Sequence, residues 1–400
     1  MYAVLLSRAK RTSQSKVQDW AVTMRTPPLE LAAVCCTIFL ALLSPTNAFS
    51  SAGISHQAKP SYSKLSATSP SHDEIFNDFA NFLQTTQNDI ISKLESVDGS
   101  GEEFTEDRWG ALTELSYSDE ITPETGSGGI TRVIQKGNVI EKGACSLTLI
   151  QKGKLTAERA KAISGRNDNA NVKEGDMYSA AALSIVLHTR SPLVPTFRSD
   201  VRIFLVRSEK SGSTSAWFGG GADLTPYYLF DDDIKEFHSK QKELCDSYFP
   251  PDAEFADTFN YARMKKACDE YFFLPARQEH RGVGGTFYDD MPATENTLAF
   301  TKAMAESWLP SWLPIVERRK ELDYTDQQRE WQLLRRGRYL EFNLLYDRGV
   351  KFGLANSNPR VEGVMVSAPP LIAWEYNHEI EEGSEEERLM KILKEPIEWL

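Results

Sequence analysis

The stretch Ala216-Trp-Phe-Gly-Gly-Gly-Ala-Asp-Leu-Thr-Pro-Tyr-Tyr228 is the most informative part of the chain. Two bulky aromatic residues run into three consecutive glycines, and a single carboxylate, Asp223, follows them. Glycines leave the backbone without side chains, so a large flat ligand can lie against it. Because glycine runs are also common in loops, a strand end with a wide turn explains the glycines equally well. The flanking aromatic residues and the lone acid favour a ligand-binding floor at Gly219, Gly220 and Gly221.

The composition is that of a soluble globular protein. Of the 400 residues, 41% are hydrophobic and 26% are charged, which provides enough apolar material for a sizeable core. The net charge of −12 argues against nucleic-acid binding, because phosphate backbones attract basic surfaces. The five cysteines include no Cys-x-x-Cys pair, so neither a disulfide framework nor a zinc site is predicted.

The first 72 residues have the composition of a targeting segment. Basic residues precede an apolar run at 31–43, and small residues follow at 46–48, which is the layout of a secretory signal peptide. Residues 49–72 contain many serines and no Asp or Glu, as transit peptides do. We therefore expect a signal peptide at 1–48, a disordered transit peptide at 49–72 and the mature domain at 73–400. The apolar run is too short for a stable membrane span.

A signal peptide followed by a transit peptide, with Phe49 directly after the cut, resembles the two-part presequences of algae with secondary plastids. The expected location is therefore the plastid. Plain secretion stays open as an alternative, although the unpaired cysteines argue against it. A mitochondrial presequence also stays open, although the hydrophobic run argues against that location.

Hydrophobic periodicity predicts an α+β fold. Ser71-His-Asp-Glu74 is a capping box, and helical spacing continues from it to Asp98-Gly99. Because the strands return through hairpins or helical pairs, we expect a single domain with a large antiparallel sheet flanked by helices on both faces. Polar segments around 107–109 and at 155–171 are expected to be loops. The expected helices span residues 71–98, 231–248, 255–273, 294–309, 313–322 and 326–336, and the expected strands span 130–135, 139–150, 180–188, 201–206, 340–344 and 364–368.

The charged residues around the glycines point to an anionic ligand. Guanidinium groups bind carboxylates through two parallel hydrogen bonds, although any single arginine can equally be a surface residue or an ion-pair partner. Asp223 could accept hydrogen bonds from N–H groups at the centre of a ligand, or it could cap the turn at Thr225. None of the six histidines is spaced like a helical metal pair, so no metal site is predicted. Arginines beside strand ends, glycines or prolines are Arg198, Arg202, Arg281, Arg338, Arg348 and Arg360.

Five long motifs follow one another in the second half of the chain: Trp217-Phe-Gly-Gly-Gly-Ala-Asp-Leu-Thr-Pro-Tyr-Tyr228, Arg281-Gly-Val-Gly-Gly-Thr-Phe-Tyr-Asp-Asp290, Leu313-Pro-Ile-Val-Glu-Arg-Arg-Lys320, Arg335-Arg-Gly-Arg-Tyr-Leu-Glu-Phe-Asn-Leu-Leu-Tyr-Asp-Arg-Gly349 and Pro369-Pro-Leu-Ile-Ala-Trp-Glu-Tyr376. Through these motifs, the chain resembles oxygen-dependent coproporphyrinogen III oxidases from about Ile75 to the C-terminus. The resemblance implies conversion of two substrate propionates to vinyl groups, with O2 as co-substrate and without an organic cofactor. It also implies a tetrapyrrole substrate, a role in haem and chlorophyll synthesis, and a homodimer with contacts in 339–374.

The resemblance also assigns residues. It makes Asp223 the central carboxylate facing the pyrrole N–H groups, and it makes Arg202 and Arg360 propionate anchors. Arg198 stands at the position of a catalytic histidine proposed as proton donor, and an arginine cannot donate a proton near neutral pH. Another family histidine corresponds to Ala276. The residues expected to bind substrate are Ser184, His188, Asp200, Val201, Arg202, Gly219, Gly220, Gly221, His238, Arg281, Asn358, Pro359 and Arg360.

Two other functions remain compatible with the sequence. The chain could be a catalytically impaired paralogue that binds a tetrapyrrole or a partner subunit. It could also be an unrelated arginine-rich protein that binds an anion. Turnover of coproporphyrinogen III distinguishes the enzyme from both.

Overall fold

The computed structural model describes residues 69–164, 172–354 and 359–400. Helix α1, His72–Asp98, begins at the predicted capping box: the Ser71 hydroxyl accepts from the Glu74 N–H, and the Ser71 N–H donates to the Glu74 carboxylate at 2.7 Å. It ends at Gly99, whose φ of 61° is in the left-handed region that glycine favours. The predicted signal peptide, and the transit peptide up to residue 68, lie outside the described residues.

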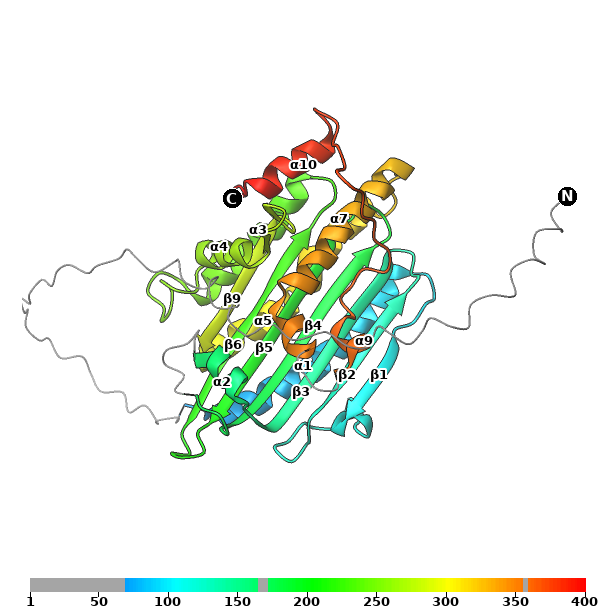
Figure 1. The fold of residues 1–400 in the computed structure, drawn as a ribbon. Helices are drawn as coiled ribbons and strands as arrows, with labels where there is room; N and C mark the ends of the chain where they lie inside the picture. Colours follow the sequence, from blue (N-terminus) through cyan, green and yellow to red (C-terminus); the bar gives the residue numbers. More distant parts are fainter. Residues whose placement is uncertain (1–68, 165–171, 355–358) are drawn as a thin grey trace, which may run out of the picture. The chain divides into compact units, whose positions relative to one another are not determined.

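The described residues form one large antiparallel sheet of seven strands in the order β1-β2-β3-β4-β5-β6-β9, shown in Figure 1. Neighbouring strands are joined in sequence up to β6, which then pairs with β9. A second, two-stranded sheet joins β7 and β8. The strands are β1 Thr105–Gly110, β2 Gly128–Gln135, β3 Ile140–Lys154, β4 Met177–Thr189, β5 Thr196–Arg207, β6 Thr214–Thr225, β7 Phe273–Leu274, β8 Glu279–His280 and β9 Gly284–Pro292.

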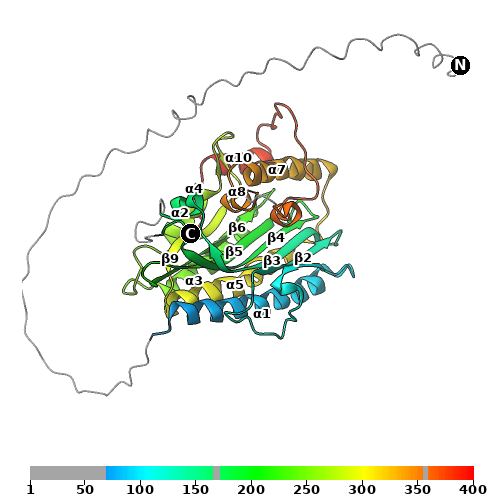
Figure 2. The ribbon, with the colours of Figure 1, turned by 60° about the horizontal axis from the view of Figure 1, so that its bottom comes forward.

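Helices cover both faces of the large sheet, which confirms the predicted α+β architecture. Figure 2 shows α1 and α5 on one side, and α7, α8 and α10 on the other. Helices α1 and α5 both contact β5 and β6. The other helices and the short 3-10 turn are η1 Ala111–Thr113, α2 Ala157–Ser164, α3 Asp231–Tyr248, α4 Tyr261–Tyr271, α5 Glu295–Glu306, α6 Trp308–Arg319, α7 Asp326–Leu345, α8 Arg348–Leu354, α9 Val361–Val364 and α10 Glu385–Lys394.

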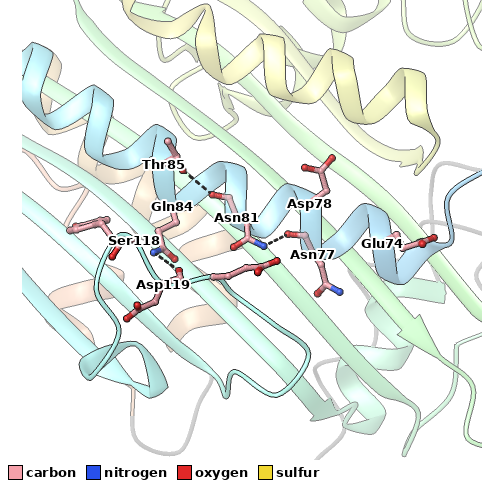
Figure 3. A pocket seen from close by; sticks show the side chains of 10 residues that line it. Glu74, Asn77, Asp78, Asn81, Gln84, Thr85, Ser118 and Asp119 are labelled. Atoms are coloured by element: carbon pink, nitrogen blue, oxygen red, sulfur yellow. Dashed lines mark hydrogen bonds between the residues drawn. The ribbon is translucent and has the colours of Figure 1, made fainter.

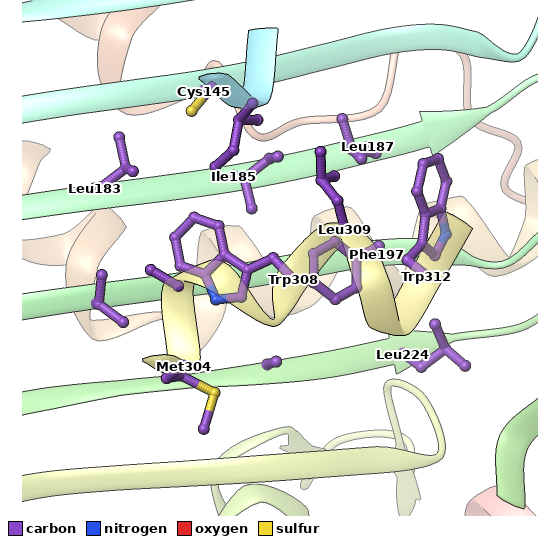
Figure 4. Packing of buried hydrophobic residues seen from close by; sticks show 14 of the residues in the cluster. Cys145, Leu183, Ile185, Leu187, Phe197, Leu224, Met304, Trp308, Leu309 and Trp312 are labelled. Carbon is purple, nitrogen blue, oxygen red and sulfur yellow. The ribbon is translucent and has the colours of Figure 1, made fainter. Parts of the chain in front are cut away.

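The hydrophobic core lies between the large sheet and the helices on its α1 face. Alternate residues of β5, among them Phe197 and Val201, are fully buried in this core. Figure 4 shows Trp308 and Trp312 of α6 packed with Phe197 and with leucines of the sheet. The Trp312 indole N–H donates to the Pro195 carbonyl at 3.0 Å, which fixes the ring position. Since strand side chains alternate between faces, the intervening residues of β5 point to the opposite face.

Three sequence-based assignments are wrong. Residues 340–344, expected to be a strand, belong to α7, which a capping box at Thr325 starts. Its buried residues, including Arg336, Tyr339 and Asn343, follow helical spacing, whereas Leu344 is 47% exposed. The apolar letters that suggested alternation therefore do not mark one buried face. Residues 364–368 also form no strand, since α9 ends at Val364.

The third wrong assignment is the loop around 107–109, which is part of the edge strand β1. Its sequence, Thr-Glu-Asp-Arg-Trp-Gly, is polar and mostly exposed, so it has no hydrophobic alternation to detect. Residues 155–164 include α2 rather than only a loop, and the remainder of that predicted loop, 165–171, lies outside the described residues. No helix in the described ranges is long and apolar enough to cross a membrane.

Candidate functional site

Strand register brings several predicted site residues to one face of the sheet. Asp223 of β6 lies directly opposite Arg198 of β5, and Gly219 lies opposite Arg202. Asp200 lies opposite Gly221 on one side. On its other side it lies opposite Ser184 of β4. Directly opposed residues share a face, so these side chains occupy the face away from the α1 core.

Asp200 lies between two arginines on this face. Arg198 Nη1 lies 2.7 Å from one Asp200 oxygen, and Arg202 donates to the other. Burial disfavours the charged carboxylate, but the two guanidinium groups outweigh this and hold the pKa of Asp200 below its ordinary value. Burial likewise disfavours the Arg198 charge, but Asp200 and Asp223 outweigh it and raise the pKa of Arg198 above its ordinary value. Arg198 is therefore a permanent cation and cannot donate a proton.

The chain of charges continues towards β9 and α8. Arg202 Nη2 lies 3.3 Å from one oxygen of Asp289, and Arg348 Nη2 lies 3.2 Å from the other. Both distances exceed the 2.7–2.9 Å typical of strong charged hydrogen bonds. Sequence analysis did not select Asp289, although its position in the Asp-Asp pair after the second glycine segment was the available signal.

Asp223 forms a buried ion pair with Arg281. Arg281 Nη2 donates to Asp223 Oδ2 at 2.7 Å, and the two side chains are only 1–2% exposed. The centroids of three aromatic rings lie within 5 Å of the guanidinium carbon: Phe272 at 3.9 Å, Tyr339 at 4.3 Å and Phe342 at 4.9 Å. Asp223 Oδ1 is also buried, and it has no hydrogen-bond partner within the described part of the chain.

The glycine segment has a packing role in addition to any ligand role. A side chain at Gly221 would meet the Thr286 carbonyl oxygen of β9 at 2.2 Å, and one at Gly220 would meet the Asp200 carbonyl oxygen at 2.6 Å. Over Gly219, a Cβ would meet the Arg202 guanidinium at 2.8 Å. Neighbouring strands therefore require glycine at 220 and 221, whereas the nearest atoms over Gly219 belong to the Arg202 side chain.

His188 lies on the same face, beneath α7. Its Nε2 lies 2.9 Å from the Ser367 carbonyl, which only accepts, so Nε2 carries the proton. Nδ1 is then the acceptor for Thr196 Oγ1 at 3.3 Å, and Thr196 accepts from the Tyr227 hydroxyl at 2.6 Å. Burial, reinforced by the Arg336 charge, lowers the pKa of His188 well below its ordinary value. A neutral His188 therefore attaches the Ser367 segment to the sheet.

Other predicted site residues are not brought to this cluster. The Val201 side chain is in the α1 core. His238 of α3 is fully buried, with Nδ1 2.8 Å from the Tyr261 hydroxyl. Arg360 pairs with Asp107 of the edge strand at 2.5 Å. Since β1 and β5 are four strand spacings apart, this places Arg360 about 19 Å from β5.

Two further predicted residues, Asn358 and Pro359, lie at the boundary of the described residues. Pro359 is half-buried and its carbonyl accepts from the Val361 N–H at 3.0 Å. Asn358 lies outside the described residues. Ala276, which the resemblance matches to a family histidine, is exposed.

A surface pocket of about 590 Å³ lies elsewhere, between α1 and the loop that follows η1 (Figure 3). It contains none of the predicted site residues. Its polar lining is satisfied in part locally, since Gln84 donates to the Asp119 carbonyl at 3.1 Å. The lining residues are Glu74, Asn77, Asp78, Asn81, Gln84, Thr85, Tyr117, Ser118, Asp119 and Glu120.

Comparison with known proteins identifies the family. The chain matches the family described as coproporphyrinogen III oxidase over residues 78–399. The mitochondrial oxygen-dependent coproporphyrinogen-III oxidase of Mus musculus is 40% identical over 321 residues, which cover 80% of this chain and 67% of that protein. The chloroplastic enzyme of Glycine max is 40% identical over 328 residues, covering 80% and 79%. The Drosophila melanogaster enzyme is 41% identical over 322 residues, covering 80% and 76%. The chain therefore belongs to the coproporphyrinogen III oxidase family.

The buried histidines predict a pH dependence of stability. Burial, with a contribution from Lys265, lowers the pKa of His238 to about 3, and His188 is shifted in the same direction. Both stay neutral in the fold but take up protons in the unfolded chain below about pH 6.5. Their stabilisation is thus complete above that pH and is lost as the pH falls towards the folded-state pKa, by about 1.4 kcal/mol per pH unit for each.

We therefore expect His238→Gln to reduce the slope of the unfolding free energy against pH by about 1.4 kcal/mol per unit between pH 6 and 5. Urea denaturation at several pH values measures it. The matched control is His378→Gln, which removes an exposed histidine in place of a buried one. An unchanged slope in His238→Gln contradicts a neutral, buried His238.

Proposed function

We propose that this chain catalyses the oxidative decarboxylation of two propionates of coproporphyrinogen III to vinyl groups, giving protoporphyrinogen IX in haem and chlorophyll synthesis. For each propionate, one carboxylate leaves as CO2, the side chain loses the equivalent of a hydride, and O2 with one proton becomes H2O2. Membership of the family supports this proposal, as do relatives named for the same oxidase activity in animals and plants.

The observation that carries the proposal is that Arg198 and Arg202 share one sheet face with the buried carboxylate of Asp223. The substrate has four carboxylates at its rim and pyrrole N–H groups at its centre. Arg202 is 20% exposed and can receive a propionate after exchange with Asp200 or Asp289. Asp223 faces the same side and would stabilise positive charge that develops on the pyrroles.

We propose that O2 is the only co-substrate and that no organic cofactor or metal is needed. Within this scheme Arg198 acts through its fixed charge, because its pKa is raised above the ordinary value by Asp200 and Asp223 in spite of burial. Proton transfer must then use another group or water. An arginine at position 198, where the resemblance implies a proton-donating histidine, favours the second candidate function. That candidate is a paralogue that binds a tetrapyrrole without turnover.

Turnover distinguishes the two candidates. We expect coproporphyrinogen III, prepared without oxygen and then exposed to air with the protein, to yield protoporphyrin detectable by fluorescence. Asp223→Ala should reduce the rate at least about 100-fold, because it removes the proposed charge-stabilising group. Tight binding without product would contradict the oxidase proposal and support the paralogue. Retained activity in Asp223→Ala would show that Asp223 is not part of the active site.

We also propose that the chain forms a homodimer through the end of α7 and the segment that follows it. Several large apolar side chains of this segment are exposed in the single chain, and Tyr376 is 93% exposed. Large exposed apolar surfaces commonly mark interfaces. The segment overlaps residues 339–374, where the family resemblance implies dimer contacts. Its exposed members are Leu344, Leu345, Leu354, Val361, Leu371, Trp374 and Tyr376.

We expect the purified protein to sediment as a dimer. The double variant Leu371→Glu with Tyr376→Glu should raise the dimer dissociation constant at least tenfold, because each new carboxylate would be buried in the interface without a partner. Sedimentation equilibrium measures the dissociation constant. Leu322→Glu is the matched control, because Leu322 is 42% exposed but lies before this segment. A monomeric wild type, or a double variant that dimerises normally, contradicts the interface.

We propose the plastid of an alga with secondary plastids as the location. The two-part composition of residues 1–72 supports this. The relatives include both chloroplastic and mitochondrial proteins, so the mitochondrion is the alternative. A fusion of residues 1–72 to a fluorescent protein should enter the plastid of such an alga, and Phe49→Ala should reduce this import. Mitochondrial fluorescence would contradict the proposal.

A further inference from the structure

Arg281 is almost completely enclosed, and it is ion-paired with Asp223. Its side chain is 1% exposed. The ring of Phe272, directly after α4, lies 3.9 Å from the guanidinium carbon, and Tyr339 and Phe342 of α7 contribute two further rings. Aromatic rings around a guanidinium leave mainly its edge for hydrogen bonds. Nη2 on that edge donates to Asp223, whereas Nε is buried without a hydrogen-bond partner among the described residues.

Asp223 has one oxygen fixed and one without a partner. Oδ2 accepts from Arg281 at 2.7 Å, whereas Oδ1 is buried and has no hydrogen-bond partner among the residues that the structure describes. A buried acceptor without a donor is costly. Asp223 points to the same face as Arg198, which lies directly opposite it and is 18% exposed. A donor that approaches from this face would complete the coordination of Oδ1.

We propose that Arg281 is the positioning residue of Asp223: it holds Oδ2 and leaves Oδ1 as the acceptor for a pyrrole N–H of the tetrapyrrole. The proposal rests on the function proposed above and changes the role of Arg281, which sequence comparison placed among the substrate-binding residues. The aromatic rings of Phe272, Tyr339 and Phe342 contribute to this positioning, because they restrict the guanidinium to one position. Arg281 therefore acts on the substrate only through Asp223.

Two roles for Arg281 predict different combined effects. If it acts only through Asp223, its replacement has no further effect on binding once the Asp223 carboxylate has been removed. If it binds a substrate carboxylate independently, the two losses multiply. Replacing both ionised residues by neutral, similarly shaped ones removes the buried charges together, so the double variant should fold even if one single variant does not.

The test is anaerobic titration calorimetry with coproporphyrinogen III, in which the absence of O2 separates binding from turnover. Asp223→Asn should weaken binding roughly ten- to hundredfold, the usual effect of losing a hydrogen bond to a charged group. Arg281→Gln should weaken it to a similar extent. The variant with both substitutions should bind within about threefold of Asp223→Asn. Binding free energies of two substitutions add only when the two residues act independently, and in this proposal Arg281 acts only through Asp223. A further tenfold loss in the double variant overturns the proposal.

A second buried pair controls for general loss of stability. Arg335 donates to Glu279 at 2.7 Å, and these side chains are 5% and 7% exposed. Arg335→Gln should lower the unfolding temperature as Arg281→Gln does, but it should leave the affinity for coproporphyrinogen III unchanged. Equal affinity losses in both variants show a merely structural role for Arg281 and overturn the proposal. If Arg281→Gln does not fold, Asp223→Asn and the double variant still decide it.

Failure of the proposed function gives a different result. A wild-type protein that neither binds nor converts coproporphyrinogen III overturns the proposed function. A wild-type protein that binds, with losses that multiply across the two sites, overturns only the role of Arg281.

Discussion

The buried ion pair between Asp223 and Arg281 is the interaction on which the site depends. It connects the end of β6 to the segment that enters β9, and helix α7 covers it with two aromatic rings. Removing one partner of such a pair costs about 3–5 kcal/mol, because the other charge stays buried without compensation. The pair therefore constrains the two glycine segments, α4 and α7 to one arrangement.

The remaining charges on this face alternate in sign. Arg198, Asp200, Arg202, Asp289 and Arg348 follow one another, so each carboxylate lies between two guanidinium groups. Asp200 is thus the counter-charge for Arg198, and the pair allows an arginine to occupy a position where the family resemblance implies a histidine. The arrangement gives these five residues one excess positive charge, which the nearby Asp347 balances. It also makes exchange of a protein carboxylate for a substrate carboxylate the expected binding step.

Local signals predicted the fold better than the site. The bounds of α1 followed from Ser71 and Gly99, because caps are encoded by neighbouring residues. The strand register that brings Arg198 to Asp223 has no such local code. Residue 340–344 alternation was misleading because Tyr339 and Phe342 are packed by helical spacing against Arg281.

The rings around Arg281 could not be found from sequence, since Phe272 and Phe342 are separated by 70 positions and meet only in the fold. Arg360 and His238 were selected by resemblance, yet each pairs elsewhere, with Asp107 and Tyr261. The glycine segment was correctly recognised as unusual. Its physical basis at Gly220 and Gly221 is the close approach of neighbouring strands, which a single-sequence pattern does not distinguish from a ligand floor.

The most direct measurement is a crystal structure of the protein with coproporphyrinogen III, prepared without oxygen. We predict a pyrrole nitrogen within about 3 Å of Asp223 Oδ1, with Oδ2 still bonded to Arg281 and a propionate at Arg202. A substrate propionate bonded to Arg281, or a tetrapyrrole bound away from Asp223, would contradict the proposed organisation of the site.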